Sequence, residues 1–203
     1  MDDGELNKDT GKPTGGGDAV ASRMELYDWV QCIVTAVLCG ILIFVFIGRI
    51  DGIKGPSMMQ TLQDGDRVIL SNLFFTPKYG DIVFVKTEAY GDTPIVKRVI
   101  ATGGQTIDID FTQGVVYVDG KALQEDYTNT PTTLREDFSG PVTIPDGYVF
   151  VMGDNRNDSL DSRSGAVGLV DTRQILGKVL FVLIPGINTD GTRHWDRIGS
   201  VYK

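Results

Sequence analysis

The sequence feature that most constrains the fold is an uncharged apolar run, WVQCIVTAVLCGILIFVFIG, from Trp29 to Gly48. As an α-helix this run would extend roughly 30 Å, which is the thickness of the hydrocarbon core of a bilayer. Gln31 and Thr35 alone interrupt it, whereas a buried helix of a soluble protein shows polar positions at helical spacing. The run therefore predicts a single membrane-spanning helix.

The flanking residues favour a permanent anchor over a cleavable signal peptide. A signal peptide has a basic start, a shorter apolar core and a small-x-small cleavage site. Here the start is mostly acidic, and the following GRIDGIKG contains no such site. We therefore expect a disordered polar tail over residues 1–24 and an anchor over residues 25–50. The basic residues on the two sides are nearly balanced, so the positive-inside rule leaves the orientation open.

Composition excludes several classes of function. The net charge of −8 argues against nucleic acid as a partner, because phosphate binding needs a concentrated basic surface. Both cysteines, Cys32 and Cys39, lie inside the apolar run, so neither a disulfide framework nor a thiol nucleophile is expected in the rest of the chain. With one histidine, His194, neither a zinc site nor a histidine-based hydrolase is expected, and no cofactor is implied.

After the anchor, short β-branched runs bounded by Gly, Pro, Asp or Asn predict an all-β domain over residues 51–203. No amphipathic helix is indicated in this part. The fold class is thus mainly β, with one N-terminal membrane helix and a small inserted β subdomain at about 103–148, which includes the weakly patterned TNTPTTLREDFSG. The predicted strands lie within residues 66–73, 80–87, 95–102, 106–111, 114–120, 141–144, 147–154 and 177–185.

Three stretches carry residues suited to catalysis, and the first is GPSMMQTL, residues 55–62. Pro56 fixes its own φ and restricts the residue before it, so Ser57 follows a stiff bend. Met58 and Leu62 would give an apolar surface beside the hydroxyl. A serine hydroxyl is a weak nucleophile unless a base removes its proton. The alternative interpretation is an ordinary surface turn.

The second stretch, TPIVKRVIATGG, contains a lysine on an apolar strand face. Strand alternation places Ile95, Lys97 and Val99 on one face and Val96 on the other. Burial there would disfavour the ammonium form and lower the pKa of Lys97, leaving a neutral amine competent as a general base. The alternative is a lysine that reaches water from a strand at the sheet edge.

The third stretch, GDNRNDSLDSR at residues 153–163, is dense in turn formers and hydrogen-bonding side chains. Asp161 and Arg163 could form a bidentate, charge-assisted pair, and Ser159 could hydrogen-bond a buried amine. The alternative is a solvated polar loop. Together the three stretches supply every part of a Ser–Lys dyad, which needs no histidine.

These stretches resemble those of type I signal peptidases, in the compact single-span form typical of Gram-positive bacteria. The resemblance runs from the anchor to about Pro185 and is specific because five blocks keep their order and spacing. The blocks are GPSMMQTL, YGDIVFVK, VKRVIATGG, GDNRNDSLDSR and GKVLFVLIP.

Carried over by position, the resemblance implies Ser57 as nucleophile, with its backbone N–H in the oxyanion hole, and Lys97 as general base. Ser159 would hold the lysine amine, and the Asp161–Arg163 pair would brace the loop. A shallow pocket for the small residue before the scissile bond would be lined by Ile53, Met58, Leu62 and Val96, with Gly55 beside it.

The chain departs from the family pattern at two places that concern loop rigidity and pocket shape. Gln60 stands where the family usually has proline, and residues 101–105 read ATGGQ where Gly-Leu-Pro-Gly-Asp is often found. In addition, Gly55 offers no hydroxyl where some members place one on the oxyanion.

The resemblance implies a serine endopeptidase that removes signal peptides from exported preproteins. It implies a single-pass protein of the cell membrane, with a cytoplasmic N-terminus and an extracytoplasmic catalytic domain. Expected partners are signal peptides, the lipid bilayer and the secretion translocase, and no nucleic acid. The alternatives are an anchored Ser–Lys peptidase that matures other substrates, a soluble self-cleaving repressor, which the anchor disfavours, and a catalytically silent, membrane-tethered binding module.

Overall fold

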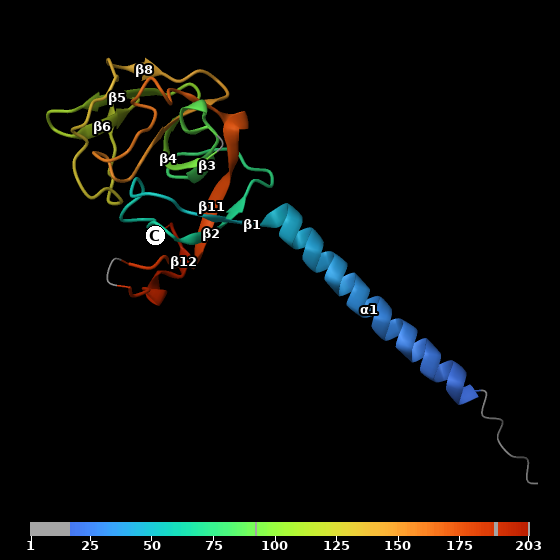
Figure 1. Cartoon of the computed structure of the whole chain (residues 1–203). Coiled ribbons are helices and arrows are strands. Elements are labelled where there is room, and N and C mark those ends of the chain that lie inside the picture. Colours follow the sequence, from blue (N-terminus) through green and yellow to red (C-terminus); the bar gives the residue numbers. More distant parts are fainter. Residues whose placement is uncertain (1–16, 92, 189–190, 203) are drawn as a thin grey trace, which may run out of the picture. The chain divides into compact units, whose positions relative to one another are not determined.

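The computed structural model describes residues 17–91, 93–188 and 191–202 (Figure 1). The chain divides into two compact units, with the boundary between Ile43 and Phe44. Helix α1 spans Gly17–Ile47 and so begins inside the stretch expected to be a disordered tail. Residues 18–24 contain no glycine or proline that would stop a helix. The remainder of the expected tail, residues 1–16, lies outside the described residues.

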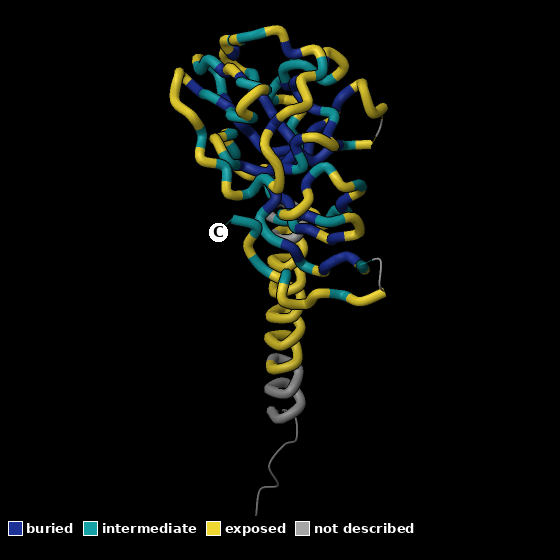
Figure 2. Tube along the Cα trace, turned by 90° about the vertical axis from the view of Figure 1, so that its left-hand side faces the viewer, coloured by how far each residue is buried: buried dark blue, intermediate teal, exposed yellow. Residues whose placement is uncertain are grey.

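The described residues of α1 are exposed, and Figure 2 shows this part of the helix in yellow. They include large apolar residues such as Trp29, Ile33 and Leu38. The window Glu25–Leu42 is long and apolar enough to cross a membrane, with a mean hydropathy of 1.4, and none of its residues is buried. A core helix of a soluble protein would be mostly buried. The structure therefore does not support that alternative for α1.

Two antiparallel sheets make up the second unit. The larger has eight strands in the order β1-β2-β11-β3-β4-β9-β10, with β12 also paired to β11. Its strands are β1 (Arg49–Gly52), β2 (Arg67–Ser71), β3 (Ile82–Val85), β4 (Ile95–Thr102), β9 (Tyr148–Met152), β10 (Val170–Asp171), β11 (Ile175–Ile184) and β12 (Gly199–Ser200). The smaller sheet has the order β7-β6-β5-β8 and contains β5 (Thr106–Asp110), β6 (Val115–Val118), β7 (Lys121–Ala122) and β8 (Val142–Thr143).

Each of the eight predicted stretches contains a strand, and four further strands were not predicted. The unpredicted strands are β1, β7, β10 and β12, of four residues or two, and they lie at sheet ends or pair on one side only. Such short segments cannot display the alternation on which the prediction depends. In the described part of the domain, the helical segments are the 3₁₀ turns η1 (Glu88–Tyr90), η2 (Thr172–Gln174) and η3 (Trp195–Arg197).

Strand β4 lies at the centre of the core. It pairs with β3 on one side and β9 on the other, and all of it except Thr102 is buried. Its residues enter different apolar clusters: Val96 packs with Phe84, whereas Ile95 and Val99 pack in a second cluster. The alternation predicted for these positions is therefore confirmed. The alternative of a lysine at a sheet edge is wrong, because Lys97 lies on this central strand.

The two sheets share a core. One apolar cluster joins residues of β5 and β6, such as Ile107 and Val116, to Ile100 of β4 and Phe150 of β9. In Figure 1 the strands β5, β6 and β8 gather beside β3 and β4. Residues 128–140 contain no regular element, but Phe138 of this segment is buried in the shared cluster. The inserted part is therefore attached to the rest of the domain by packing as well as by the chain.

Candidate active site

A loop between β1 and β2, residues 53–66, carries Ser57. Backbone hydrogen bonds close its base, because the Ile53 N–H donates to the Asp66 carbonyl at 2.8 Å and the Gly65 N–H donates to the Ile53 carbonyl at 3.0 Å. Within the loop, the Met59 N–H donates to the Pro56 carbonyl at 3.0 Å. The serine is thus held in a turn, as the Gly-Pro sequence before it predicts.

Gly55 makes this turn possible. Its φ of +84° is strained for a residue with a side chain, and its N–H donates to Asp64 Oδ1 at 2.7 Å. A Cβ at this position would meet nothing within 4 Å, so open space lies beside the residue. A reactant therefore has room to approach the loop near Ser57.

The Lys97 amine and the Ser57 hydroxyl are in direct contact. Lys97 Nζ donates a hydrogen bond to Ser57 Oγ at 2.7 Å. The lysine side chain is buried, with 2% of the residue exposed, and burial lowers the pKa of its ammonium group to about 8. The nearby Asp161 carboxylate acts in the opposite direction and limits the decrease. With this pKa about a tenth of the amine is unprotonated at pH 7 and about half at pH 8.

The loop after β9, residues 153–163, is centred on the Asp161 carboxylate. Arg163 donates from Nε to Asp161 Oδ1 at 2.8 Å and from Nη2 to Oδ2 at 2.9 Å, and both side chains are fully buried. Arg163 also donates to the carbonyls of Leu134 and Arg156. The predicted bidentate pair is present. The alternative of a solvated loop is wrong, because the loop is built around buried charges.

Ser159 lies in this loop with a different partner from the one expected. Its hydroxyl donates to Asp161 Oδ2 at 2.9 Å, while the Lys97 amine donates to Ser57. No hydrogen bond between Ser159 and Lys97 occurs in the described part of the chain. Asp161 draws the hydroxyl proton because a carboxylate is a stronger acceptor than an amine nitrogen that is itself donating.

Gly153, at the end of β9, permits the loop and the serine to approach each other. A Cβ on Gly153 would lie 2.5 Å from the Ser57 carbonyl oxygen and closer still to the Ser159 hydroxyl. Its N–H donates to Asp161 Oδ2 at 3.0 Å. Sequence reasoning did not single out Gly153; the signal available was a glycine directly between a buried strand and a polar loop.

A second buried ion pair near Lys97 was not predicted from the sequence. Arg98, which follows Lys97, donates from Nε and Nη2 to both oxygens of Asp154 at 2.8 and 2.7 Å. The Thr61 hydroxyl donates to Asp154 Oδ2 at 2.5 Å. The strand of the lysine, the loop after β9 and the loop of Ser57 therefore meet at one carboxylate.

A third pair joins the inserted part to the same loop. Arg156 donates to both oxygens of Glu125 at 2.7 and 2.6 Å and to the Gly153 carbonyl at 3.1 Å. The Tyr127 hydroxyl also donates to Glu125, and the pKa of Tyr127 is raised by burial and by that carboxylate. The guanidinium of Arg98 lies 4.0 Å from the centre of the Tyr127 ring.

The residues expected to line a substrate pocket lie together in the cluster that contains Met58, the neighbour of Ser57 in the chain. They belong to one apolar cluster and are between 0% and 8% exposed: Ile53, Met58, Leu62 and Val96. They therefore form a largely closed apolar floor, above which there is little depth for a substrate side chain. Their part in substrate binding stays a prediction.

The backbone at Ser57 is oriented by Asn155. The Asn155 N–H donates to the Ser57 carbonyl at 3.0 Å, and its side-chain amide donates to the Pro56 carbonyl at 3.3 Å. The N–H of Ser57 itself has no hydrogen-bond partner among the residues that the structure describes. It is thus free to donate to an oxyanion formed next to the hydroxyl.

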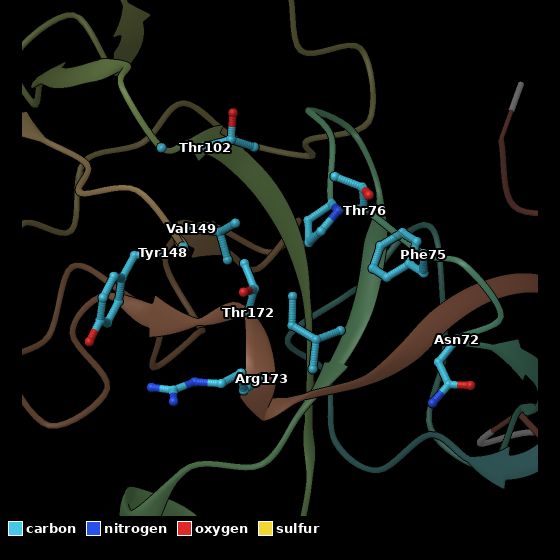
Figure 3. Close-up of a pocket in the computed structure, with 12 residues that line it drawn as sticks. Asn72, Phe75, Thr76, Thr102, Tyr148, Val149, Thr172 and Arg173 are labelled. Carbon is cyan, nitrogen blue, oxygen red and sulfur yellow. The ribbon is translucent and has the colours of Figure 1, made fainter.

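Cavities also border other parts of the domain. One of about 830 Å³ borders the Ser57 loop at Gln60, Thr61 and Gln63, and Tyr127 and Arg197 form other parts of its wall. Another, of about 530 Å³, is lined by residues that include Thr102, Tyr148 and Arg173 (Figure 3). The second cavity shares no residue with the Ser57–Lys97 contact. In the described ranges, no group of three or more His, Cys, Asp or Glu side chains could hold a metal ion.

Comparison with known proteins identifies relatives along most of the chain. The sequence model of the family described as signal peptidase, peptidase S26, matches residues 26–184. The chain is 35% identical to signal peptidase I of Bacillus licheniformis over 177 residues, which cover 80% of this chain and 91% of that protein. It is 36% identical to signal peptidase I S of Bacillus subtilis over 180 residues, covering 82% and 93% of the two chains.

Among solved structures, a signal peptidase I from Enterococcus faecalis aligns at a TM-score of 0.43 and 27% identity. The alignment covers 51% of this chain and 97% of that one.

Replacing Lys97 with methionine tests the burial of the amine. The folded-state pKa of about 8 lies below the unfolded value of about 10.4, so the unfolded state binds more protons between these pH values. The free energy of unfolding of the wild type should therefore rise by about 3 kcal/mol from pH 8 to pH 10.5. The Lys97→Met variant should lack this rise and be more stable at pH 7 by up to about 3 kcal/mol.

Urea unfolding of both proteins as a function of pH measures this difference. Identical pH dependence in the two proteins would show that the amine is not buried as described.

Proposed function

Because the chain belongs to the signal peptidase family, peptidase S26, we propose that Ser57 and Lys97 are its catalytic dyad. The family relationship identifies the protein as a serine endopeptidase that removes signal peptides. The observation that carries the assignment of the two residues is the 2.7 Å hydrogen bond between Lys97 Nζ and Ser57 Oγ. It joins a hydroxyl to a buried amine whose lowered pKa suits a general base.

Acylation begins when the neutral Lys97 amine removes the proton from Ser57. The serine oxygen attacks the carbonyl carbon of the scissile peptide bond and forms a tetrahedral intermediate with a negative oxygen. The protonated lysine then gives its proton to the leaving amine, and the peptide bond breaks. The mature protein departs, and the signal peptide remains as an ester on Ser57.

Water completes the reaction with the same two groups. The lysine amine, neutral again, removes a proton from water, and the resulting hydroxide attacks the ester. The proton returns to Ser57 Oγ as the ester breaks. In both halves the Ser57 N–H is positioned to donate to the oxyanion, a type of contact that is worth about 3 to 4 kcal/mol.

The apolar floor supports a preference for small residues before the scissile bond. The lining side chains are almost completely buried, so a large substrate side chain would find no depth above Met58 or Leu62. Gly55 leaves this side of the loop open. Gln60 is exposed and lies outside the apolar cluster, so the departure from proline at this position does not alter the floor.

The rival functions lack comparable support. A silent binding module would not need an amine held against a hydroxyl at a cost in stability, and a self-cleaving repressor would not need the apolar helix α1. An anchored peptidase acting on other substrates would use the same dyad. The similarity to signal peptidases I along most of the chain favours preproteins.

The proposal extends to location and partners. Helix α1 would cross the cell membrane once, with its N-terminus in the cytoplasm and the β domain outside, where signal peptides of exported proteins are accessible. The length and apolar character of Glu25–Leu42 support the span. The lipid bilayer is then a partner, and the secretion translocase that delivers preproteins is a further proposed partner.

Cleavage of a preprotein with an Ala-x-Ala site tests the dyad. Purified full-length protein in detergent should cut after the second alanine, as shown by mass spectrometry of the products. Ser57→Ala and Lys97→Arg should each lower kcat/KM by several orders of magnitude, because the first lacks the nucleophile and the second is always charged. Full activity of Lys97→Arg would refute the general base.

The pH dependence of the same reaction should report the lysine. Since the base acts in its neutral form, kcat/KM should rise about tenfold per pH unit below the pKa of Lys97 and level off above about 8. A profile that is flat from pH 6 to pH 9 would exclude Lys97 as the base.

Gly153→Ala should damage catalysis by displacing Ser57. The added methyl group would overlap the Ser57 carbonyl, and a shift of about 1 Å at a reacting atom can cost about a hundredfold in rate. Gly165→Ala is the matched control, because a Cβ there makes an ordinary contact with Asp137 at 3.4 Å. Equal kcat values for the two variants would contradict the close approach at Gly153.

Protease protection tests the orientation. Protease added to intact protoplasts should degrade the part of the chain after Gly48 and leave the part before Trp29 protected until the membrane is lysed. The reverse pattern would overturn the proposed topology.

A further inference from the structure

The end of the chain reaches back to the loop that carries Ser57. This C-terminal segment, residues 191–202, contains η3 and β12 and lies beyond residues 26–184, which the family model matches. Strand β12 pairs with β11 through Gly199 and Ser200 (Figure 1). The segment is thus attached to the large sheet before it contacts the loop.

The main contact is a bidentate ion pair between Arg197 and Asp66. Arg197 donates from Nη1 to Asp66 Oδ1 at 2.9 Å and from Nη2 to Oδ2 at 2.6 Å. Asp66 is fully buried at the base of the Ser57 loop, and Arg197 is the cation that pairs with it among the described residues. Arg197 Nη1 also donates to Gln63 Oε1 at 2.9 Å.

Asp66 passes this restraint to the backbone of the loop. Its carboxylate accepts from the Gln63 N–H at 2.8 Å, and its own carbonyl accepts from the Ile53 N–H at 2.8 Å. The Gly186 N–H also donates to Asp66, at 2.7 Å. Asp66 therefore connects both ends of the loop to the C-terminal segment, through its backbone carbonyl at Ile53 and through its carboxylate at Gln63 and Arg197.

Tyr202 provides a second attachment. Its hydroxyl accepts a hydrogen bond from the Ile82 N–H at 2.9 Å. Val201 and Tyr202 pack against the apolar cluster that contains Met58 and Leu62. The C-terminal segment therefore supports the apolar floor as well as the base of the loop.

The loop borders open space between these attachments. The cavity of about 830 Å³ is lined by Thr61 and Gln63 of the loop and by Arg197, Ser200 and Tyr202 of the C-terminal segment, among other residues. Where the loop borders this cavity, Thr61 is held by Asp154 and Arg98, and Gln63 is held by Arg197. Arg197 is the residue of the C-terminal segment that makes a charged contact with the loop.

We propose that the C-terminal segment is a positioning element of the active site, in which Arg197 acts through Asp66 to hold Ser57 against Lys97. The inference rests on the proposed dyad. Arg197 touches neither reacting group, so its effect should be on kcat, through the geometry of Ser57, more than on substrate binding. A displacement of about 1 Å at a nucleophile can cost about a hundredfold in rate.

The experiment compares three variants of the full-length protein in detergent with the wild type. Arg197→Met removes the ion pair and leaves Asp66 buried without a cation. The double variant Asp66→Asn/Arg197→Met removes that unpaired charge as well, so the stability of the fold recovers while the charged tether stays absent. Arg173→Met is the matched control, because Arg173 forms a similar pair with Asp171 on the surface, away from the dyad.

The readouts are kcat and KM on a preprotein, the pH profile of kcat/KM, and urea unfolding. Both variants at position 197 should lower kcat roughly tenfold or more, with KM changed less than about threefold. The apparent pKa at which kcat/KM levels off should rise by about half a pH unit or more. A displaced loop would admit water to Lys97, and water stabilises the ammonium form. Arg173→Met should match the wild type in all three readouts.

Two results would overturn the proposal. If Arg197→Met keeps kcat within twofold of the wild type, the arginine does not position the serine. If the double variant recovers both stability and kcat, the pair serves only the fold. The baseline is that the wild type cleaves the preprotein and that Ser57→Ala does not. If this difference is not observed, the dyad itself is refuted, which is a different result from failure of the positioning role.

Discussion

The structure around the site depends on one buried amine that has no carboxylate partner. Four arginines near the dyad each form a bidentate pair with a carboxylate: Arg98, Arg156, Arg163 and Arg197. In the described part of the chain, no carboxylate forms an ion pair with Lys97, whose amine donates to the Ser57 hydroxyl. A buried cation without a counter-ion is destabilised relative to its neutral form, and that difference suits the amine to the proposed role of a base.

The paired arginines explain how a protein tolerates such a site. A buried ion pair is costly to desolvate but, once formed, is destabilising to break, so each pair fixes the segments that it joins. Asp154 links the strand of the base to the Ser57 loop, and Asp161 organises the loop after β9. The unpaired amine is therefore enclosed by segments that are held in place. Their polar groups have little freedom to move toward the amine and stabilise its charged form.

The inserted part of the domain takes part in this enclosure, through residues between β7 and β8. Glu125 receives the guanidinium of Arg156, and the Leu134 carbonyl receives Nη1 of Arg163. The insertion thereby supplies acceptors to the loop that surrounds Asp161, in addition to sharing its apolar cluster with β4 and β9. Its contribution to the site is indirect, through the position of residues 153–163.

Local patterns in the sequence predicted the apolar helix, the longer strands and the class of fold, and they indicated Ser57 and Lys97 as candidates for the proposed dyad. These follow from neighbouring residues: an uncharged run, alternation along IVKRVIAT, and a proline before Ser57. The tertiary structure alone decided that Lys97 lies on a central strand, that Ser159 donates to Asp161, and that Arg98, Arg156 and Arg197 find carboxylates in other segments. The reason is physical, because desolvation and pairing depend on which distant segments enclose a group, and no local pattern records that.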